Sequence, residues 1–437
     1  MMKTKTMLTL QMIVKTGFLL GTLLILIHNS VAENFGILEP STEIIETGLD
    51  NRSLAMGKTT TITSRSSSAI FSNPSILGTF TKTQVQAGGK LLYGTIVNEA
   101  ALADNAYASY QGKYLLFPNR SYLAFAVPYR LPHRHLPRPR HWQLVFGMGY
   151  QRNEGAKGEI QAVWAEEGGT ELKGEPVSIH GRRRGAMSTL TPGIAFNFLD
   201  KYFCGVTFNR TFGAITYTNE LKGSDYYKKV DDEQEQSALF LRIGALAKVT
   251  PELSVGLTYR PAFDWELGET ITRIVENGEI ETSRDQTYAT LTIPTMWGLG
   301  AEYKLSPEFV IALEVQSRPF SNLQWEGDVR QELFIDNGFN FSVGAEYSGI
   351  GFPVRFGAFQ EVIPFVDEND TAPLNLLGLT AGIGSNREAA FSWDASVLFG
   401  TWEQLNDKGQ KYSENLIRVG ISATYHFRTN FGGAAIN

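Results

Sequence analysis

The chain has 437 residues, a net charge of −6 at neutral pH, 43 glycines and one cysteine, and charged side chains of both signs are spread along it. This balance excludes a basic surface for nucleic acid, and a single cysteine excludes a disulfide scaffold within the chain. No run of about 18 apolar residues that would form a membrane-spanning helix follows Ser30. The glycine and aromatic content (12%) instead favours strands joined by turns.

Residues 1–32 have the order of a secretory signal peptide. Two lysines precede a short apolar core at residues 17–27, and Ser30 and Ala32 stand where a signal peptidase reads small side chains. The apolar core is shorter than the about 20 residues of a comfortable membrane span. We therefore expect export, cleavage and a mature chain that starts near Glu33, with an uncleaved N-terminal anchor as the alternative.

Period-two alternation of apolar and polar residues dominates the chain after residue 140. In residues 253–260, for example, Leu253, Val255, Leu257 and Tyr259 alternate with polar residues and glycine. Because successive side chains of a strand point to opposite faces, such a segment has one apolar face. The pattern predicts strands near residues 142–153, 186–198, 202–218, 236–249, 252–267, 285–304, 308–326, 337–348, 353–364, 374–384, 389–403 and 414–428.

The connections between these segments alternate in length. Short links such as 199–201 and 250–251 are each followed by a longer one, such as 219–235 and 268–284. Short turns on one rim and long loops on the other are typical of bacterial outer-membrane barrels. A soluble sandwich gives the same alternation within a strand, but closure into a barrel removes the exposed edges of so many strands. We therefore predict a transmembrane antiparallel β-barrel.

Residues 81–94 and 107–130 add one more pair of strands, which brings the total to about 14, an even number as in bacterial barrels. The second strand is expected to break at Phe117-Pro118-Asn119, because proline forbids a regular ladder. Counting strands then assigns the basic run 128–141 to the short-turn, periplasmic rim, either as a solvated turn or as a contact for an acidic partner or lipid headgroup. Prolines between the histidines of this run prevent a regular arrangement of metal ligands, and the run contains no cysteine or carboxylate. No metal site is therefore predicted there. These histidines are His133, His135 and His141.

Four short motifs stand in a specific order along the chain. They are Ser-Ala-Ile-Phe-Ser-Asn-Pro-Ser at 68–75, Pro-x-x-Ala-Phe at 192–196, Gly-x-x-Tyr-Arg at 256–260 and Pro-x-x-x-x-x-Gly-x-x-Tyr at 294–303. Their order and spacing resemble the long-chain fatty acid transporter family of outer membranes, the FadL/TodX-like proteins. The resemblance covers most of the chain, although Ser75 stands where the family pattern has alanine.

The resemblance implies a barrel of about 14 strands over residues 81–428 and an N-terminal hatch, residues 33–80, folded inside its lumen. Residues 429–437 would form a periplasmic tail. In that family, hydrophobic substrates bind in the barrel and leave sideways through a gap in the wall. An apolar pocket suits such cargo, because burying apolar surface is favourable by about 25 cal/mol per Å².

Three residues mark the expected hatch: Phe71, Asn73 and Pro74. Pro74 fixes its own φ angle and disfavours a helical conformation at Asn73. The side chain of Asn73 is then expected to tie the hatch to the wall by hydrogen bonds. A plain turn before the first strand is the alternative.

Four arginines on predicted polar strand faces are candidate ligand contacts in the lumen. No local motif marks the cation that meets a carboxylate in the resembled family, so these residues follow from alternation alone. Lumen charges paired with Glu302, Glu314 or Glu346 are the alternative. The four candidates are Arg242, Arg260, Arg355 and Arg418.

The sequence thus predicts a bacterial outer-membrane channel, not an enzyme, for passive uptake of fatty-acid-like molecules or hydrocarbons, without cofactor, metal or catalytic residues. No Gly-x-Ser-x-Gly, P-loop or His-Glu-x-x-His motif is present. Expected partners are the hydrophobic ligand, outer-membrane lipid, lipopolysaccharide and the barrel assembly machinery. Residues 418–427 resemble the C-terminal sequence signal that this machinery recognises. The alternatives are a FadL-like barrel that serves as a scaffold or secretion-system component, a general polar porin, and a soluble exported protein or barrel enzyme.

Overall fold

A computed structural model describes most of the chain after residue 49. The described residues are 50–103, 106–130, 142–154, 158–168, 171–172, 177–222, 227–275, 283–327, 337–362, 375–385, 390–405 and 411–427. By internal contacts the chain divides into residues 1–46 and 47–437, and only the second part is described below. The predicted signal peptide, the start of the predicted hatch, residues 131–141 of the basic run and the predicted tail lie outside the described residues. Among those residues, no helix is long and apolar enough to cross a membrane.

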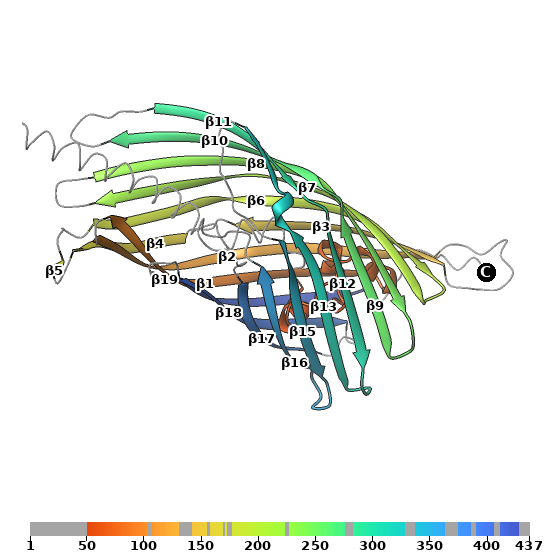
Figure 1. Cartoon of the computed structure of the whole chain (residues 1–437). Coiled ribbons are helices and arrows are strands. Elements are labelled where there is room, and N and C mark those ends of the chain that lie inside the picture. The colour runs from red at the N-terminus through yellow and green to blue at the C-terminus, as the bar shows by residue number, and fades with distance from the viewer. Residues whose placement is uncertain are drawn as a thin grey trace, which may run out of the picture. The chain divides into compact units, whose positions relative to one another are not determined.

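One antiparallel sheet contains the nineteen described strands, and it closes on itself (Figure 1). The first strand, β1 (Gln84–Ala103), pairs with β2 (Ala106–Arg130) on one side and with the last strand, β19 (Lys411–His426), on the other. The remaining strands are β3 (Gln143–Glu154), β4 (Gly158–Gly168), β5 (Glu171–Leu172), β6 (Val177–Phe198), β7 (Tyr202–Lys222), β8 (Tyr227–Lys248), β9 (Leu253–Arg260), β10 (Phe263–Val275), β11 (Ser283–Ile293), β12 (Met296–Lys304), β13 (Phe309–Pro319), β14 (Gln324–Gly327), β15 (Asn337–Tyr347), β16 (Val354–Val362), β17 (Asn375–Gly384) and β18 (Phe391–Leu405).

In several places, two consecutive strands are pieces of the same wall strand. β3 and β4 both pair with β2 and β6, and β9 and β10 both pair with β8. β11 continues into β12, and β13 continues into β14. Counted in this way, the chain forms a closed 14-strand antiparallel barrel, as the alternation predicted.

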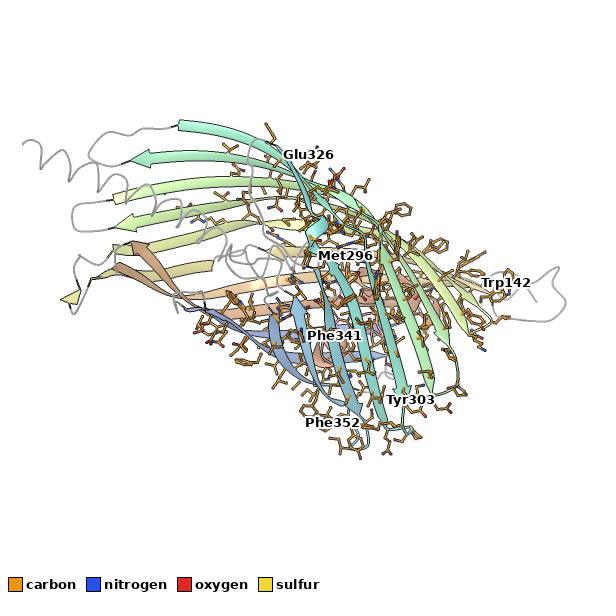
Figure 2. All side chains as sticks on the ribbon, in the orientation of Figure 1. Trp142, Met296, Tyr303, Glu326, Phe341 and Phe352 are labelled. Atoms are coloured by element: carbon orange, nitrogen blue, oxygen red, sulfur yellow. The ribbon has the colours of Figure 1, made fainter. Side chains whose placement is uncertain are left out.

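The barrel has an inside-out distribution of side chains. On β12, Gly298, Gly300 and Glu302 face inward and are buried, whereas Leu299 and Tyr303 face outward. Outward apolar side chains elsewhere are largely accessible, and Figure 2 shows them as sticks over the wall, with Tyr303 and Phe341 labelled. A soluble sandwich would bury this face, so the continuous exposed apolar face is that of a membrane-spanning barrel.

The predicted short turns join the strands at one rim. The β6–β7 turn has Leu199 and Asp200 in the left-handed region, with φ angles of 63° and 56°. Two consecutive positive φ angles match the right-handed twist of a hairpin. Asn197 stabilises the turn, because its side chain accepts a hydrogen bond of 2.9 Å from the Asp200 amide. We call this end of the barrel the short-turn rim. Arg130 of β2 and Gln143 of β3 pair there, on either side of the basic run.

Two of the predicted long loops are largely strand in the structure. β7 and β8 continue as a ladder until Lys222 pairs with Tyr227, and β10 and β11 continue until Arg273 pairs with Ser283. The prediction of loops at 219–235 and 268–284 was therefore wrong. These extensions are polar on both faces, so they lack the hydrophobic period by which strands are recognised in a sequence.

Prolines interrupt the wall at several places. At Pro118 the sequence predicted a break, but β2 continues through residues 117–119 as one strand, and only its register against β1 shifts there. The single strands predicted at 252–267, 285–304 and 308–326 are each divided, the first at Pro261, the second at Pro294 and the third by the 3-10 turn η3 (Phe320–Asn322). Proline lacks the N–H that a ladder needs, so it breaks a central strand.

Candidate functional site

Residues 50–83, here called the N-terminal segment, lie against the inner faces of strands from around the barrel. The segment contains α3 (Asn51–Ala55), η1 (Ser67–Phe71) and η2 (Pro74–Thr79). α3 contacts β16, β17, β18 and β19, η1 contacts β1, β2, β3 and β6, and η2 contacts β3, β6, β7 and β8. From residue 50 to residue 80, every side chain is buried except those of Arg65 and Thr79, which are half-buried. The segment is rich in serine and threonine, so its burial depends on hydrogen bonds rather than on apolar packing alone.

Glycines on the inner wall allow the backbone of the N-terminal segment to approach closely. A Cβ atom at Gly357 would lie 2.0 Å from the amide nitrogen of Gly57, and one at Gly344 would lie 2.4 Å from the carbonyl oxygen of Met56. Gly57 itself has a φ angle of +68°, which favours glycine. The strand faces that are rich in glycine therefore form the surface against which this segment packs.

Buried ion pairs join the N-terminal segment to the wall. Arg52 donates two hydrogen bonds of 2.9 Å to the carboxylate of Glu346, and Arg355 contacts Glu346 at 2.5 Å and Asp394 at 2.7 Å. Burial by itself lowers the pKa of Arg52, but the charges of Glu346 and Glu302 raise it on balance above its ordinary value. This bidentate geometry is the strong form of an arginine–carboxylate pair.

Glu314 on β13 accepts further hydrogen bonds from the segment. The backbone amide of Thr61 donates to it at 2.8 Å and the Thr61 hydroxyl at 2.9 Å. Two strands further along the wall, on β16, Glu361 pairs with Lys58 at 2.6 Å. The wall carboxylates thus hold the segment at Arg52, Lys58 and Thr61.

Asn73 and Pro74, which the sequence marked as hatch residues, lie at the start of η2. The Asn73 side chain caps η2, where its oxygen accepts from the Ser75 amide at 3.1 Å. Its amide group donates to the carbonyl of Thr61 at 2.7 Å and to the wall carbonyl of Ala245 at 3.4 Å. Gly205 and Gly244 leave the space that Pro74 and Asn73 fill.

Arg242, Arg260 and Arg318 are buried on the inner faces of β8, β9 and β13, where the charges of Arg242 and Arg318 act on Arg260. The guanidinium of Arg260 lies 5.9 Å from the ring centre of Phe240 and 5.2 Å from that of Phe263, and Arg242 lies 5.9 Å from Phe240. We call these five residues the arginine–aromatic cluster. Guanidinium groups over aromatic faces form favourable cation–π contacts, so the cluster offers positive charge beside an apolar surface.

The N-terminal segment contacts this cluster directly. Arg242 donates a hydrogen bond to the backbone carbonyl of Phe71, and Phe71 packs edge-on against Tyr122 of β2 with ring centres 6.1 Å apart. Sequence reasoning selected Arg242 and Arg260 but missed Arg318. The alternation of Ala312, Glu314 and Gln316 on the inner face of β13 was the signal that could have identified it.

The other two predicted arginines lie elsewhere on the wall. Arg355 is fully buried in the ion pairs with Glu346 and Asp394. Arg418, on the inner face of β19, is opposite Leu92 of β1 in the ladder. Lys90 lies two residues before Leu92 on β1 and is opposite Arg120 of β2. These three cations form a second basic group on a different arc of the sheet, and all three are buried.

The inner wall also holds one serine–histidine contact. Ser392 Oγ lies 3.5 Å from His426 Nε2 near the short-turn rim, which is the outer limit of a hydrogen bond. Asp394, two residues further along β18, is ion-paired with Arg355 at 2.7 Å. In the part of the chain that the structure describes, no group of three or more His, Cys, Asp or Glu side chains could hold a metal ion.

Comparison with known proteins yields one family and a set of solved structures. A family model described as outer membrane protein transport protein (OMPP1/FadL/TodX) matches residues 42–348. A FadL homologue from Pseudomonas aeruginosa is 13% identical, with a TM-score of 0.57 over 87% of this chain and 100% of that chain. The toluene transporter TodX from Pseudomonas putida is 14% identical, with a TM-score of 0.58 over 88% and 99%.

A third structure is the toluene transporter TbuX from Ralstonia pickettii, 15% identical, with a TM-score of 0.55 over 87% of this chain and 99% of that chain. At these identities the structures show a shared fold. No curated protein matches the chain.

Proposed function

Because the chain belongs to the FadL/TodX family of outer-membrane transport proteins, we propose that it is a passive channel with a hatch, through which hydrophobic molecules cross the outer membrane. The observation that carries this proposal is the hydrogen bond between Arg242 of the arginine–aromatic cluster and the Phe71 carbonyl of the N-terminal segment. It connects a place suited to a ligand with the segment that would have to move.

The N-terminal segment is the hatch in this proposal, and it comprises the described part of residues 33–80. Its support is the burial of residues 50–80 and their hydrogen bonds to Glu314, Glu346 and Ala245 on different strands. In this proposal, a segment held in this way closes the barrel axis to water and retains apolar cargo inside. Cargo would then leave sideways through the wall.

The arginine–aromatic cluster favours amphiphiles with an anionic head over neutral hydrocarbons. Arg242, Arg260 and Arg318 supply charge for a carboxylate, and Phe240 and Phe263 supply apolar surface for the adjoining chain. Hydrogen bonds that involve a charged group contribute about 1.5–3 kcal/mol each. Arg418, beside Lys90 on another arc, is proposed as a secondary contact along the lumen. Arg355 is assigned to fixing the wall and the hatch.

The surroundings of the barrel follow from the same proposal. Outer-membrane lipid covers the apolar outer face, lipopolysaccharide surrounds the rim opposite the short turns, and the assembly machinery inserts the chain after cleavage of residues 1–32. The short-turn rim is then periplasmic. Outer-membrane fractionation, together with the N-terminal mass of the mature protein, tests these points.

A proteoliposome experiment tests the proposed transport. Purified protein is reconstituted, and the transfer of a pyrene-labelled long-chain fatty acid is compared with that of liposomes without protein, alongside ion conductance in planar bilayers. The proposal expects faster probe transfer with low conductance. High conductance would indicate a polar porin. Absent binding and transfer, with a protein partner recovered from membranes, would support the scaffold or secretion-system alternative.

A further inference from the structure

On three wall strands, β2, β3 and β8, the outward apolar side chains end at the same row of the ladder. The last apolar residues are Leu123, Tyr150 and Leu239, and the outward polar residues that follow them are Ser121, Arg152 and Ser237. These polar residues belong to one ladder row that crosses β2, β3, β6, β7 and β8. Because the outer face of a membrane barrel is apolar only within the hydrocarbon layer, this row marks an edge of that layer.

This edge lies one membrane thickness away from the short-turn rim. β3 runs from Gln143, which pairs with Arg130 at that rim, to Arg152 at the edge of the apolar face. A tilted strand needs about 9–11 residues to cross a membrane, and residues 143–152 have that length. In the orientation proposed above, the short-turn rim is periplasmic, so the edge at Arg152 lies among the headgroups of the outer leaflet.

Two arginines face outward at this edge of the apolar face. Arg152 of β3 and Arg210 of β7 are both exposed, and β6 lies between their strands (Figure 1). Arg152 is opposite Ser188 of β6, and Arg210 is opposite Leu190, on the side of the short-turn rim. Strands lie about 4.8 Å apart and rise about 3.3 Å per residue, which places the two Cα atoms about 12 Å apart. We call Arg152 and Arg210 the outer basic pair.

Aromatic rings and hydroxyl groups surround the outer basic pair. Phe208 and Phe212 flank Arg210 on the outward face of β7 and are about half exposed. The hydroxyl groups of Tyr150 and Ser188 share a hydrogen bond of 2.9 Å on the neighbouring strands. Among the described residues, no carboxylate forms an ion pair with Arg210. A guanidinium in this setting is suited to a lipid phosphate, which accepts its hydrogen bonds in bidentate fashion.

The neighbouring arc of the wall is acidic on its outward face. Glu235 of β8, Glu266 of β10 and Glu326 of β14 are exposed there and line one groove of about 780 Å³. The ladder row that contains Arg152 reaches Glu266 through Ser237. Carboxylates repel a phosphate, and like charges placed together suppress the wrong contact. An anionic headgroup at this edge is therefore directed to the arc of β3, β6 and β7.

We propose that the outer basic pair is a binding site for lipid A, the membrane anchor of lipopolysaccharide. Lipid A has a phosphate at each end of a glucosamine disaccharide, so one molecule engages both Arg152 and Arg210. A phospholipid has a single phosphate and engages one of them. The acyl chains of lipid A extend along outward apolar side chains such as Met148 of β3 and Leu241 of β8. This inference goes beyond transport and rests only on the orientation that the proposed function gives the barrel.

A lipid titration of the purified protein tests the proposal. Native mass spectrometry in an uncharged detergent measures the bound fraction as lipid A is added, with monophosphoryl lipid A and phosphatidylglycerol as comparison lipids. The variants are Arg152→Met and Arg210→Met, with Arg184→Met as the matched control. Arg184 is exposed on the same outward face of β6, about 13 Å further along that strand from the apolar face than Ser188. Heat-dependent gel mobility shows that each variant is folded, and binding of the pyrene-labelled fatty acid is measured in parallel.

We expect Arg152→Met and Arg210→Met each to weaken lipid A binding by about tenfold, the scale of one charge-assisted hydrogen bond. Arg184→Met should bind like the wild type, and monophosphoryl lipid A should bind about tenfold more weakly than lipid A. Unchanged lipid A affinity in both pair variants, or equally tight binding of phosphatidylglycerol, would overturn the inference. Arg210→Gln, with the same expectation, replaces Arg210→Met if that variant does not assemble.

The fatty-acid measurement separates this site from the proposed function. Both pair variants should bind the pyrene-labelled fatty acid like the wild type, because the outer basic pair faces away from the lumen. If the wild type binds lipid A through the pair but neither binds nor transfers the fatty acid, the proposed function fails and this site stands. If it transfers the fatty acid while lipid A binding is the same in every variant, the site fails and the proposed function stands.

Discussion

Arg242 on β8 donates a hydrogen bond to the backbone carbonyl of Phe71, and through this bond the arginine–aromatic cluster is joined to the N-terminal segment. A carboxylate that drew the Arg242 guanidinium toward itself would compete with that carbonyl. Ligand binding and displacement of the segment would then be coupled, and each would favour the other by the same factor.

Replacement of Arg242 tests this coupling. Arg242→Met removes a charged donor, and a hydrogen bond of this kind contributes about 1.5–3 kcal/mol. Amide exchange of residues 66–80, followed by mass spectrometry, should accelerate by roughly tenfold to a hundredfold, since 1.4 kcal/mol is a factor of ten. Arg210→Met on β7, where the side chain faces outward and is exposed, should leave exchange unchanged. Equal exchange in the two variants would mean that Arg242 does not hold the segment.

A side chain at Gly344 should displace the N-terminal segment. A Cβ atom there would lie 2.4 Å from the Met56 carbonyl oxygen, whereas the nearest atom to a Cβ at Gly89 is 3.7 Å away. Gly344→Val is expected to cost about 1–3 kcal/mol through overpacking and to raise ion conductance in planar bilayers. Gly89→Ala should conduct like the wild type. If Gly344→Val conducts ions no better than the wild type, the segment does not block ions.

The Arg52 ion pairs should contribute strongly to stability. Arg52→Met removes one of the two guanidinium groups that contact Glu346, and because Arg355 remains, the loss should stay below the about 3–5 kcal/mol of a fully broken buried pair. The urea midpoint of the folded barrel, followed by its heat-dependent gel mobility, should fall accordingly. Arg65→Met should cost less because the Arg65 side chain is 33% exposed. Because Glu346→Gln also weakens the pair with Arg355, the double variant Arg52→Met/Glu346→Gln should lose less than the sum of the two single variants, and an additive loss would contradict the pairing.

The arginine–aromatic cluster should discriminate between charged and neutral cargo. Arg260→Met combined with Arg318→Met is expected to weaken binding of the pyrene-labelled fatty acid by about tenfold to a hundredfold, on the scale of 1.5–3 kcal/mol per charged hydrogen bond. Binding of a pyrene-labelled alkane, which has no carboxylate, should change little. Fluorescence titration of the detergent-solubilised protein measures both. A parallel loss for the two probes would point to damage of the lumen rather than to loss of a carboxylate site.

An arginine introduced on the outward apolar face should cost more folding free energy the deeper it lies in the membrane. Leu313 is 57% exposed in the middle of β13, between the aromatic pairs Trp297–Phe339 and Phe309–Tyr347. Leu313→Arg is expected to cost about 2–4 kcal/mol in lipid, whereas a charge near the interface costs about 0–1 kcal/mol. Leu305→Arg, in the short turn, is the matched control. Folding titrations in lipid vesicles compare the two, and equal costs would contradict the membrane position of β13.

Much of the barrel was predictable from alternation because its wall strands have one apolar face along the membrane. The strand starting at Asn337 and the last strand were predicted within a few residues. The extensions of β7, β8, β10 and β11 were missed because their sequences lack an apolar period of two. The divisions at Pro261 and Pro294 were missed although both prolines are visible in the sequence. A proline shows that one ladder bond is lost, but it does not show whether the wall continues past it.

The candidate site was harder to predict, because alternation assigns a residue to a face but not to a neighbour. Arg242 and Arg355 both face inward, yet one lies beside Phe240 and the other between two carboxylates. That difference depends on which strands lie across the lumen and on the path of the N-terminal segment. A period-two pattern in the sequence contains no information on the strands across the lumen or on the path of the segment.

The pairing of β1 with β19 has a consequence for how the protein folds. The two strands that close the wall are the first and the last described, with Gln84 opposite His426, so the closing contact has nearly the largest sequence separation that the chain permits. Contacts of this kind form late and slowly. The N-terminal segment directly precedes β1, so seating it against the wall before β19 arrives would use the open edge that the β1–β19 contact then removes. Assembly order, and not stability alone, would then decide whether a newly made barrel is plugged or empty.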